Sequence, residues 1–154
     1  MRGFLVVLAA GIVAAAIAAG GSDLLFASTG PATVRITAEG ERVTQGVDTG
    51  PKGQSPGDTQ IVRETLYNRH ITKKPIGHAE FVCTYTAGRS RLCGGTFFLP
   101  KGKLMVEGPL RYRQFYELAV VGGTELYDNA RGSLTMTRLS ADPVRTLALF
   151  RLVG

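Results

Sequence analysis

The chain has 154 residues, of which 44% are hydrophobic and 19% charged, with a formal net charge of +6. This length fits a single domain and falls short of the roughly 250 residues of a (β/α)₈ barrel. The balance of hydrophobic and charged residues excludes a disordered chain, and 2 cysteines are too few for a structural zinc site or a disulfide-dense scaffold.

Residues 1–28 have the pattern of a secretory signal. A basic residue precedes an apolar run over residues 4–19, and small residues follow the run. The run is shorter than the roughly 20 residues that span a bilayer, but Leu24–Phe26 would lengthen it. An uncleaved membrane anchor over residues 4–26 is therefore the alternative. In either case we expect an exported domain over residues 29–154.

This domain is predicted to consist of short β-strands, because apolar and polar residues alternate and β-branched residues are common. The predicted strands span residues 33–38, 61–67, 76–86, 91–99, 103–107, 115–121, 133–139 and 144–152. Residues 40–58 are rich in Gly, Pro and Thr and are predicted to form a long loop, and no segment indicates a convincing helix. Eight antiparallel strands joined by tight turns favour a sandwich or a closed barrel, which has room for one small ligand.

The two cysteines lie equally far from Gly88, on either side of it. A hairpin that turns at this glycine places Cys83 and Cys93 opposite each other. Because cysteines of exported proteins usually pair, we predict a disulfide bond between them. The functional alternative is a free, reactive thiol.

Lysines and arginines are scattered along the chain, whereas a nucleic-acid-binding protein concentrates them. We therefore expect no nucleic-acid partner, and a membrane partner only if residues 4–26 stay attached. His70 and His78 are the only histidines and lack a matching carboxylate pattern, so no metal site is predicted. Gly122-Gly123-Thr124 is followed by Glu125, whose charge would repel phosphate, so this turn is predicted to be structural.

From Gly57 onward the sequence resembles the allene oxide cyclase and dirigent superfamily. The motifs that carry the resemblance, in chain order and at matching spacing, are Gly57-Asp58 with Leu66-Tyr67, Ile76-Gly77 to Cys83, Val106–Pro109, Leu118–Thr124 and Ala130–Gly132. The resemblance implies an all-β, eight-stranded antiparallel barrel of lipocalin-like shape. It also implies that an apolar cavity selects one conformer of a reactive substrate, where orientation supplies most of the effect and no cofactor is needed.

The chain departs from the cyclases at their polar positions. Ala38 stands where their first-strand glutamate belongs in a gap-free comparison, and Glu39 matches it only with a slip. Glu64 replaces their asparagine, and Cys83 matches their pocket cysteine. Cyclisation of a fatty-acid epoxide is therefore not expected, and a different hydrophobic substrate is.

Glu64 and Arg131 are the candidate catalytic residues. If Val62 and Leu66 face the interior, so does Glu64, and burial would then raise its pKa. The alternative is that the strand faces are reversed and Glu64 is solvated.

Arg131 follows an acidic loop that contains Glu125 and Asp128. Dirigent proteins often have the same arrangement, which implies binding of a phenolic or carboxylate group by these residues. The alternative is a salt bridge that fixes the loop.

Further candidate ligand-binding residues are tyrosines and one histidine. The tyrosines either donate hydrogen bonds to a carbonyl group or are packing residues whose hydroxyl group reaches water. They are Tyr67, Tyr85, Tyr112, Tyr116 and Tyr127. His78 alternates with Gly77 and faces either the pocket or the surface.

The expected function is that of a cofactor-independent cyclase or isomerase, or a stereo-directing barrel, acting on a small hydrophobic molecule. The alternative is a secreted, non-catalytic hydrophobic-ligand-binding or structural barrel. A cavity of about 300 Å³ or more would favour a ligand, and large side chains at every inward position would favour a filled barrel. Apolar residues on both strand faces at residues 147–150 fit a homo-oligomer, a trimer or a dimer.

Overall fold

The computed structural model describes residues 32–153 except 41–44, 71–72, 89 and 112–114. The predicted signal or anchor therefore lies outside the described residues. The strands are β1 (Ala32–Gly40), β2 (Gln45–Val47), β3 (Thr59–Asn68), β4 (Gly77–Ala87), β5 (Ser90–Leu99), β6 (Gly102–Leu110), β7 (Phe115–Gly123), β8 (Arg131–Ala141) and β9 (Val144–Val153). A single 3-10 turn, η1 (Glu125–Tyr127), joins β7 to β8. Within these ranges no helix is long and apolar enough to cross a membrane.

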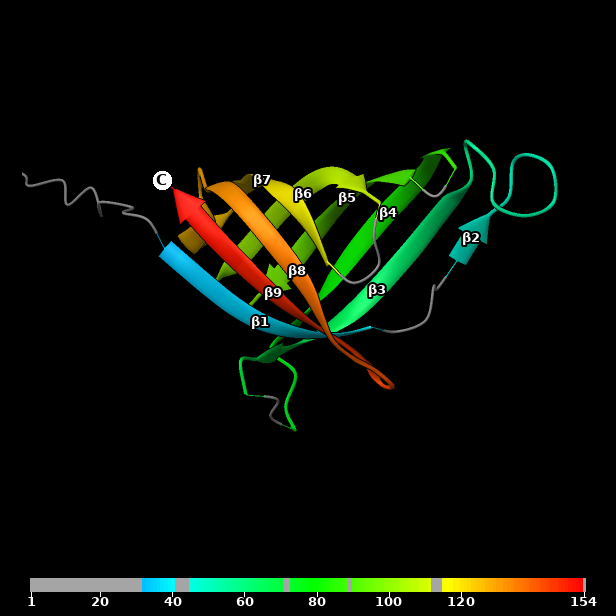
Figure 1. The fold of residues 1–154 in the computed structure, drawn as a ribbon. Coiled ribbons are helices and arrows are strands. Elements are labelled where there is room, and N and C mark those ends of the chain that lie inside the picture. The colour runs from blue at the N-terminus through cyan, green and yellow to red at the C-terminus, as the bar shows by residue number, and fades with distance from the viewer. Residues whose placement is uncertain (1–31, 41–44, 71–72, 89, 112–114, 154) are drawn as a thin grey trace, which may run out of the picture.

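The strands form one closed antiparallel barrel. Its order is β1-β9-β8-β7-β6-β5-β4-β3, and β1 also pairs with β3, which closes the ring. Figure 1 shows β1 lying beside β9, so that the first and last strands of the barrel are neighbours. Each of the eight predicted strands is present, and the predicted all-β barrel is confirmed.

The prediction of an unbroken loop over residues 40–58 is wrong at β2. This short strand pairs with the start of β3, in the register Gln45↔Ile61 to Val47↔Thr59, beyond the point where β1 ends. There the backbone groups of β3 would otherwise lack partners, and β2 supplies them. Figure 1 shows β2 and the loop after it, in cyan, projecting from one side of the barrel.

The predicted disulfide is confirmed. Cys83 and Cys93 are directly opposite each other in the β4–β5 ladder, and their sulfurs are bonded with the two Cα atoms 4.1 Å apart. The hairpin between them turns at Gly88, whose φ of +55° is a left-handed conformation that glycine adopts without steric cost. Both cysteines are buried.

Aromatic and branched side chains fill one half of the barrel. The ring of Phe97 packs edge-to-face against the rings of Phe81 and Phe150, with centroids 5.5 and 4.9 Å apart. Phe97, Phe150, Leu66, Leu104 and Leu134 are fully buried. Burial of each such side chain contributes about 1.5–3 kcal/mol. These residues lie toward the β5–β6 and β7–β8 turns, and this closed half is the floor of the barrel.

Candidate functional site

Polar side chains occupy inward positions toward the opposite end of the barrel. Each lies an even number of residues from a core residue of its own strand and therefore shares the inward face of that strand. We call these residues the mouth layer; they are Gln60, Glu64, Arg91, Tyr116 and Arg138. Glu64 is buried, Gln60, Arg91 and Tyr116 are half-buried, and Arg138 is exposed. Solvent therefore reaches inward positions at this end, while the floor is dry.

Glu64 is a buried acid on the inward face of β3. Its residue exposure is 9%, and its cross-strand neighbours, Gly40 on β1 and Ala79 on β4, have no polar side-chain atoms. In the described part of the chain, its buried Oε2 has no hydrogen-bond partner. Burial raises the pKa of Glu64 to about 7. Of the two alternatives for this strand, the inward one is correct, and the carboxyl group is able to give or take a proton near neutral pH.

Tyr116 on β7 lies within electrostatic reach of Glu64. Burial raises the pKa of Tyr116, and the negative charge of Glu64 raises it further, while Arg91 and Arg138 act in the opposite direction. The net effect is upward, so the phenol keeps its proton throughout the neutral range. Its hydroxyl group is therefore a hydrogen-bond donor beside an acid that titrates.

A hydrogen bond crosses the mouth layer between β5 and β3. The Arg91 Nη1 donates to the Gln60 Oε1 over 2.9 Å. Arg91 and Gln60 are on strands that both neighbour β4, so the bond spans the width of that strand. It holds one side of the guanidinium group in place and leaves its charge uncompensated, because an amide is neutral.

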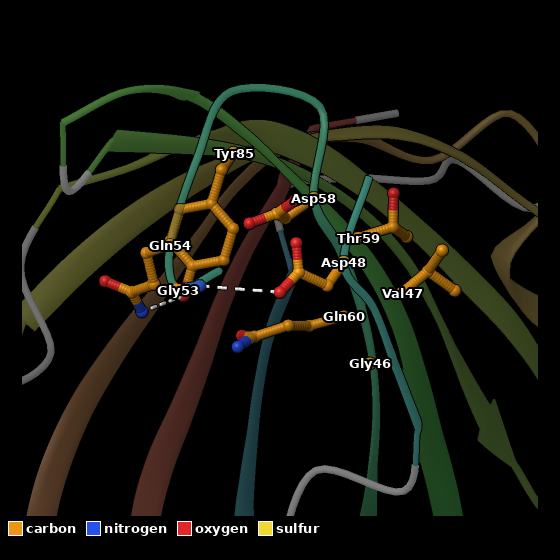
Figure 2. A pocket seen from close by; sticks show the side chains of 9 residues that line it. All are labelled: Gly46, Val47, Asp48, Gly53, Gln54, Asp58, Thr59, Gln60 and Tyr85. Carbon is orange, nitrogen blue, oxygen red and sulfur yellow. Dashed lines mark hydrogen bonds between the residues drawn. The ribbon is translucent and has the colours of Figure 1, made fainter. Parts of the chain in front are cut away.

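A surface cleft of about 340 Å³ adjoins the mouth layer at Gln60. The loop after β2 forms one wall, and Figure 2 shows its side chains with those of β3 and β4 around a common space. Gln54 Nε2 donates to the hydroxyl of Tyr85 over 2.7 Å, and the Gly53 amide donates to Asp48 Oδ2 over 3.4 Å. The cleft is lined by Gly46, Val47, Asp48, Gly53, Gln54, Asp58, Thr59, Gln60 and Tyr85.

Asp58 fixes the loop that forms this cleft. Its carboxylate accepts hydrogen bonds from the backbone amides of Thr49, over 2.9 Å, and Ser55, over 2.6 Å. These bonds, with smaller contributions from the two hydroxyl groups, lower the pKa of Asp58. Because its lone pairs are used in this way, we assign Asp58 a structural role.

Comparison with known proteins places this geometry in a fold. No protein-family model and no curated protein sequence matches the chain. Among solved structures, pyocyanin demethylase is 21% identical with a TM-score of 0.65, covering 76% of this chain and 98% of that one. The pterocarpan synthase dirigent protein GePTS1 is 16% identical with a TM-score of 0.64, covering 87% and 95%. The Diels–Alderase AbmU from Streptomyces koyangensis is 12% identical with a TM-score of 0.60, covering 80% and 64%.

The chain has the fold of the dirigent and cyclase barrels. This agrees with the resemblance carried by the sequence motifs. The structure also shows where the two residues compared with the first-strand glutamate of allene oxide cyclases lie. Ala38 faces inward and is fully buried, whereas Glu39 faces outward and pairs with Arg145, with Oε2 and Nε 3.3 Å apart. The first-strand glutamate of allene oxide cyclases therefore has no counterpart inside this barrel at either position.

Arg131 is far from Glu64. Gly132, the residue after Arg131, pairs with Leu152, and Leu152 also pairs with Ala32 at the start of β1. Glu64 instead pairs with Gly40 at the end of β1. The intervening length of β1 is roughly 26 Å at 3.3 Å per residue. These registers therefore separate the two candidate catalytic residues along the strands of the barrel.

The predicted acidic partners of Arg131 remain near it along the chain, on and beside η1. Glu125 and Asp128 are exposed, and the Arg131 Nη1 donates to the carbonyl oxygen of Ala130 over 2.8 Å. Among the residues that the structure covers, no ion pair joins Arg131 to either acid. The alternative, a loop-fixing salt bridge, is thus not found among these residues, and Arg131 donates a hydrogen bond to the backbone instead.

Two further predicted ligand-binding residues, His78 and Tyr67, lie on the outer face. His78 stacks on Phe98 with ring centroids 4.5 Å apart, and its Nε2 is 3.6 Å from Glu80 Oε1. Tyr67 is half-buried on the side of β3 opposite to the inward Leu66. Neither residue faces Glu64. Tyr112 lies outside the described residues. No group of three or more metal-ligating side chains occurs in the described ranges.

Sequence reasoning missed Gln60, Arg91 and Arg138. The signal was present, because Arg91 is two residues before the buried Cys93, and Arg138 is two residues after the buried Met136. Apart from Arg131, the scattered basic residues were used only as an argument against a nucleic-acid partner. In a barrel, however, inward positions near an open end accept charged side chains, since water reaches them there.

Proposed function

We propose that this protein is a small-molecule cyclase or isomerase, or a stereo-directing barrel, that acts on a hydrophobic molecule at the mouth layer. Glu64 carries the proposal. A buried carboxyl oxygen without a hydrogen-bond partner costs about 1–3 kcal/mol, and a purely structural barrel would avoid this cost with an apolar residue. A perturbed acid at the solvent-accessible end of a barrel is typical of a functional site.

The floor and the mouth layer have different roles in this proposal. The apolar floor under the mouth layer contacts the carbon skeleton and favours one folded conformer, which lowers the entropic part of the barrier to ring closure. The Tyr116 hydroxyl donates a hydrogen bond to a substrate carbonyl oxygen and stabilises negative charge that develops on it. These two effects suffice for a reaction in which no proton moves.

Glu64 adds acid–base help where a proton does move. The carboxylate takes a proton from a carbon next to the carbonyl group, and the resulting carboxylic acid returns it to another atom of the same molecule. The product is then an isomer of the substrate, and no co-reactant is consumed. Near its pKa of about 7, Glu64 populates both forms that this cycle needs.

A secreted carrier or structural barrel is the second candidate. The observation that favours it is the floor, where Phe97, Phe150 and Leu104 are fully buried and leave their half of the barrel packed. A carrier would hold its ligand only at the mouth layer. We also propose export, because a buried disulfide is typical of oxidising compartments; cell fractionation tests this independently.

The decisive experiment is retention of small molecules. Purified protein is incubated with a small-molecule extract of its source organism and washed, and the retained compounds are identified by mass spectrometry. Conversion of a retained compound into an isomer supports the enzyme, retention without conversion supports the carrier, and no retention supports a structural barrel. Glu64→Gln tests the mouth layer. Glu107 is an exposed, outward-facing residue of β6, so Glu107→Gln is the control that makes the same chemical change outside the mouth layer.

A further inference from the structure

The mouth layer contains two cations without an acidic partner. In the part of the chain that the structure describes, the ion pairs are Arg63–Glu80, His78–Glu80 and Arg145–Glu39, all between outward-facing residues. None involves Arg91 or Arg138. The side-chain hydrogen-bond partner of Arg91 in these ranges is the neutral amide of Gln60.

The two guanidinium groups lie on either side of Tyr116. Tyr116 pairs with Met136 on β8, and Arg138 is the next inward residue along that strand, at the diagonal position where long side chains reach each other. Arg91, on β5, pairs with Leu110 near the end of β6, and β6 is the strand between β5 and β7. The tyrosine hydroxyl and both cations therefore gather on one side of the mouth.

Among the described residues, the remaining groups that face this side form no ion pair with Arg91 or Arg138. Glu64 is the acid opposite, and it is largely protonated below neutral pH because of its burial. Its neighbours Gly40 and Ala79 do not titrate. In the adjoining cleft, Asp58 is occupied by loop hydrogen bonds, and Asp48 accepts one from Gly53.

We infer that the ligand of this site is a hydrophobic organic monoanion, whose carboxylate or phenolate oxygen pairs with Arg91 and Arg138 while its carbon skeleton lies toward the floor. This rests on the proposed function and names the substrate class for it. Guanidinium groups match planar oxyanions through paired N–H donors. The half-burial of Arg91 strengthens its pairing relative to one on the open surface, because less water screens it.

Two fluorescent probes that differ mainly by one charge test the inference. The anionic probe is 8-anilinonaphthalene-1-sulfonate, and the neutral probe with the same ring skeleton is N-phenyl-1-naphthylamine. We expect the protein to bind the anionic probe at least about 10-fold more tightly at pH 6, the size of one or two charge-assisted hydrogen bonds. Competition by 4-phenylbutyrate and by 2,4-dinitrophenolate, both ionised at this pH, then distinguishes a carboxylate ligand from a phenolate ligand.

Substitutions locate the charge preference. Arg91→Gln and Arg138→Gln should each weaken binding of the anionic probe about 10-fold and leave the neutral probe unchanged. Arg35→Gln removes the same charge from the outward face of β1 and should change neither. Because Arg138 is exposed, its variant is expected to fold even if loss of the Arg91–Gln60 bond destabilises the other.

The outcomes separate the two proposals. Equal binding of both probes, unaffected by Arg138→Gln, overturns the anion inference and leaves a hydrophobic binding site. Absence of binding by either probe overturns both the inference and the proposed function. An anion preference that Arg35→Gln reduces as much as Arg138→Gln does would reflect net charge alone and also overturn the inference.

Discussion

The charge of Glu64 raises the pKa of Tyr116, although Glu64 is on β3, Tyr116 is on β7, and three strands separate them in the sheet order. This coupling crosses the barrel interior, where closure brings side chains of distant strands together. The mouth layer therefore contains a carboxyl group that titrates near neutral pH and a phenol that keeps its proton. The first is suited to exchange a proton with a substrate, and the second to donate a hydrogen bond.

The free energy of unfolding should fall as pH rises from about 4.5 to about 7. In this range the unfolded chain ionises Glu64, whereas the folded protein keeps the proton because burial raises its pKa from 4.5 to about 7. The stabilising effect is fully present below the unfolded pKa and is lost as pH passes the folded pKa. At about 1.4 kcal/mol per pH unit, the total is about 3 kcal/mol. Urea unfolding at several pH values measures it.

Glu64→Gln should abolish most of this slope, because glutamine does not titrate. Above pH 7 the variant should be more stable than the parent protein, since no desolvated charge remains. Glu107→Gln, on the exposed face of β6, should retain the slope. Equal slopes in all three proteins would show that Glu64 titrates normally and is solvated.

Affinity for the anionic probe should decline between pH 6 and pH 8. The sulfonate stays ionised throughout, so the change comes from the protein, where Glu64 loses its proton around pH 7 and repels the anion. His78 lies outside this layer, on the outer face beside Glu80. Fluorescence titrations should therefore show no pH dependence in Glu64→Gln, while His78→Gln should behave like the parent protein.

Replacement of Cys83 and Cys93 by alanine should destabilise the fold by about 3 kcal/mol, as expected for a loop of this length. The disulfide closes a segment with a sequence separation of 10 between its cysteines. The comparison is made by urea unfolding. Thiol titration of denatured, unreduced protein should detect no free sulfhydryl group, and two titratable thiols would contradict the bond.

Most of the barrel could be predicted from alternation alone. The ladder that holds Cys83 opposite Cys93 follows from a turn at Gly88, and the residues flanking Glu64 already indicate a half-buried strand. β2 could not be predicted in this way. Its three residues, Gln45–Val47, have no apolar alternation, and they become a strand because unpaired backbone groups at the start of β3 need partners.

The site was harder to predict than the fold. Sequence reasoning singled out Glu64 correctly as an inward candidate, but it named as a second catalytic candidate Arg131, which belongs to a matching motif. A motif does not show to which end of a barrel a residue belongs. That information is in the strand registers, which put Arg131 level with the end of β9 and Arg91 level with the end of β6.

Gly123→Ala should destabilise the protein by about 2 kcal/mol or more, because overpacking without room to relax costs this much. An added Cβ atom would overlap the carbonyl oxygen of Tyr127 and lie 2.9 Å from that of Lys103. Gly94→Ala is the matched control, since a Cβ there meets nothing within 4 Å. Thermal unfolding compares them. If Gly123→Ala is as stable as Gly94→Ala, the tight β7–η1 junction is wrong.

Once a substrate is identified, Glu64→Gln should reduce turnover about 10²-fold or more, the usual effect of losing general acid–base help. At pH 6, where Glu64 is mostly protonated, binding should change little, because glutamine keeps the shape of the side chain. Tyr116→Phe should also reduce turnover, through loss of a donor to the carbonyl oxygen, but should leave the pH dependence of turnover set by Glu64. Steady-state kinetics from pH 5 to pH 9 separates these effects. If Glu64→Gln turns over as fast as Glu107→Gln, conformer selection alone explains the activity and Glu64 has no chemical role.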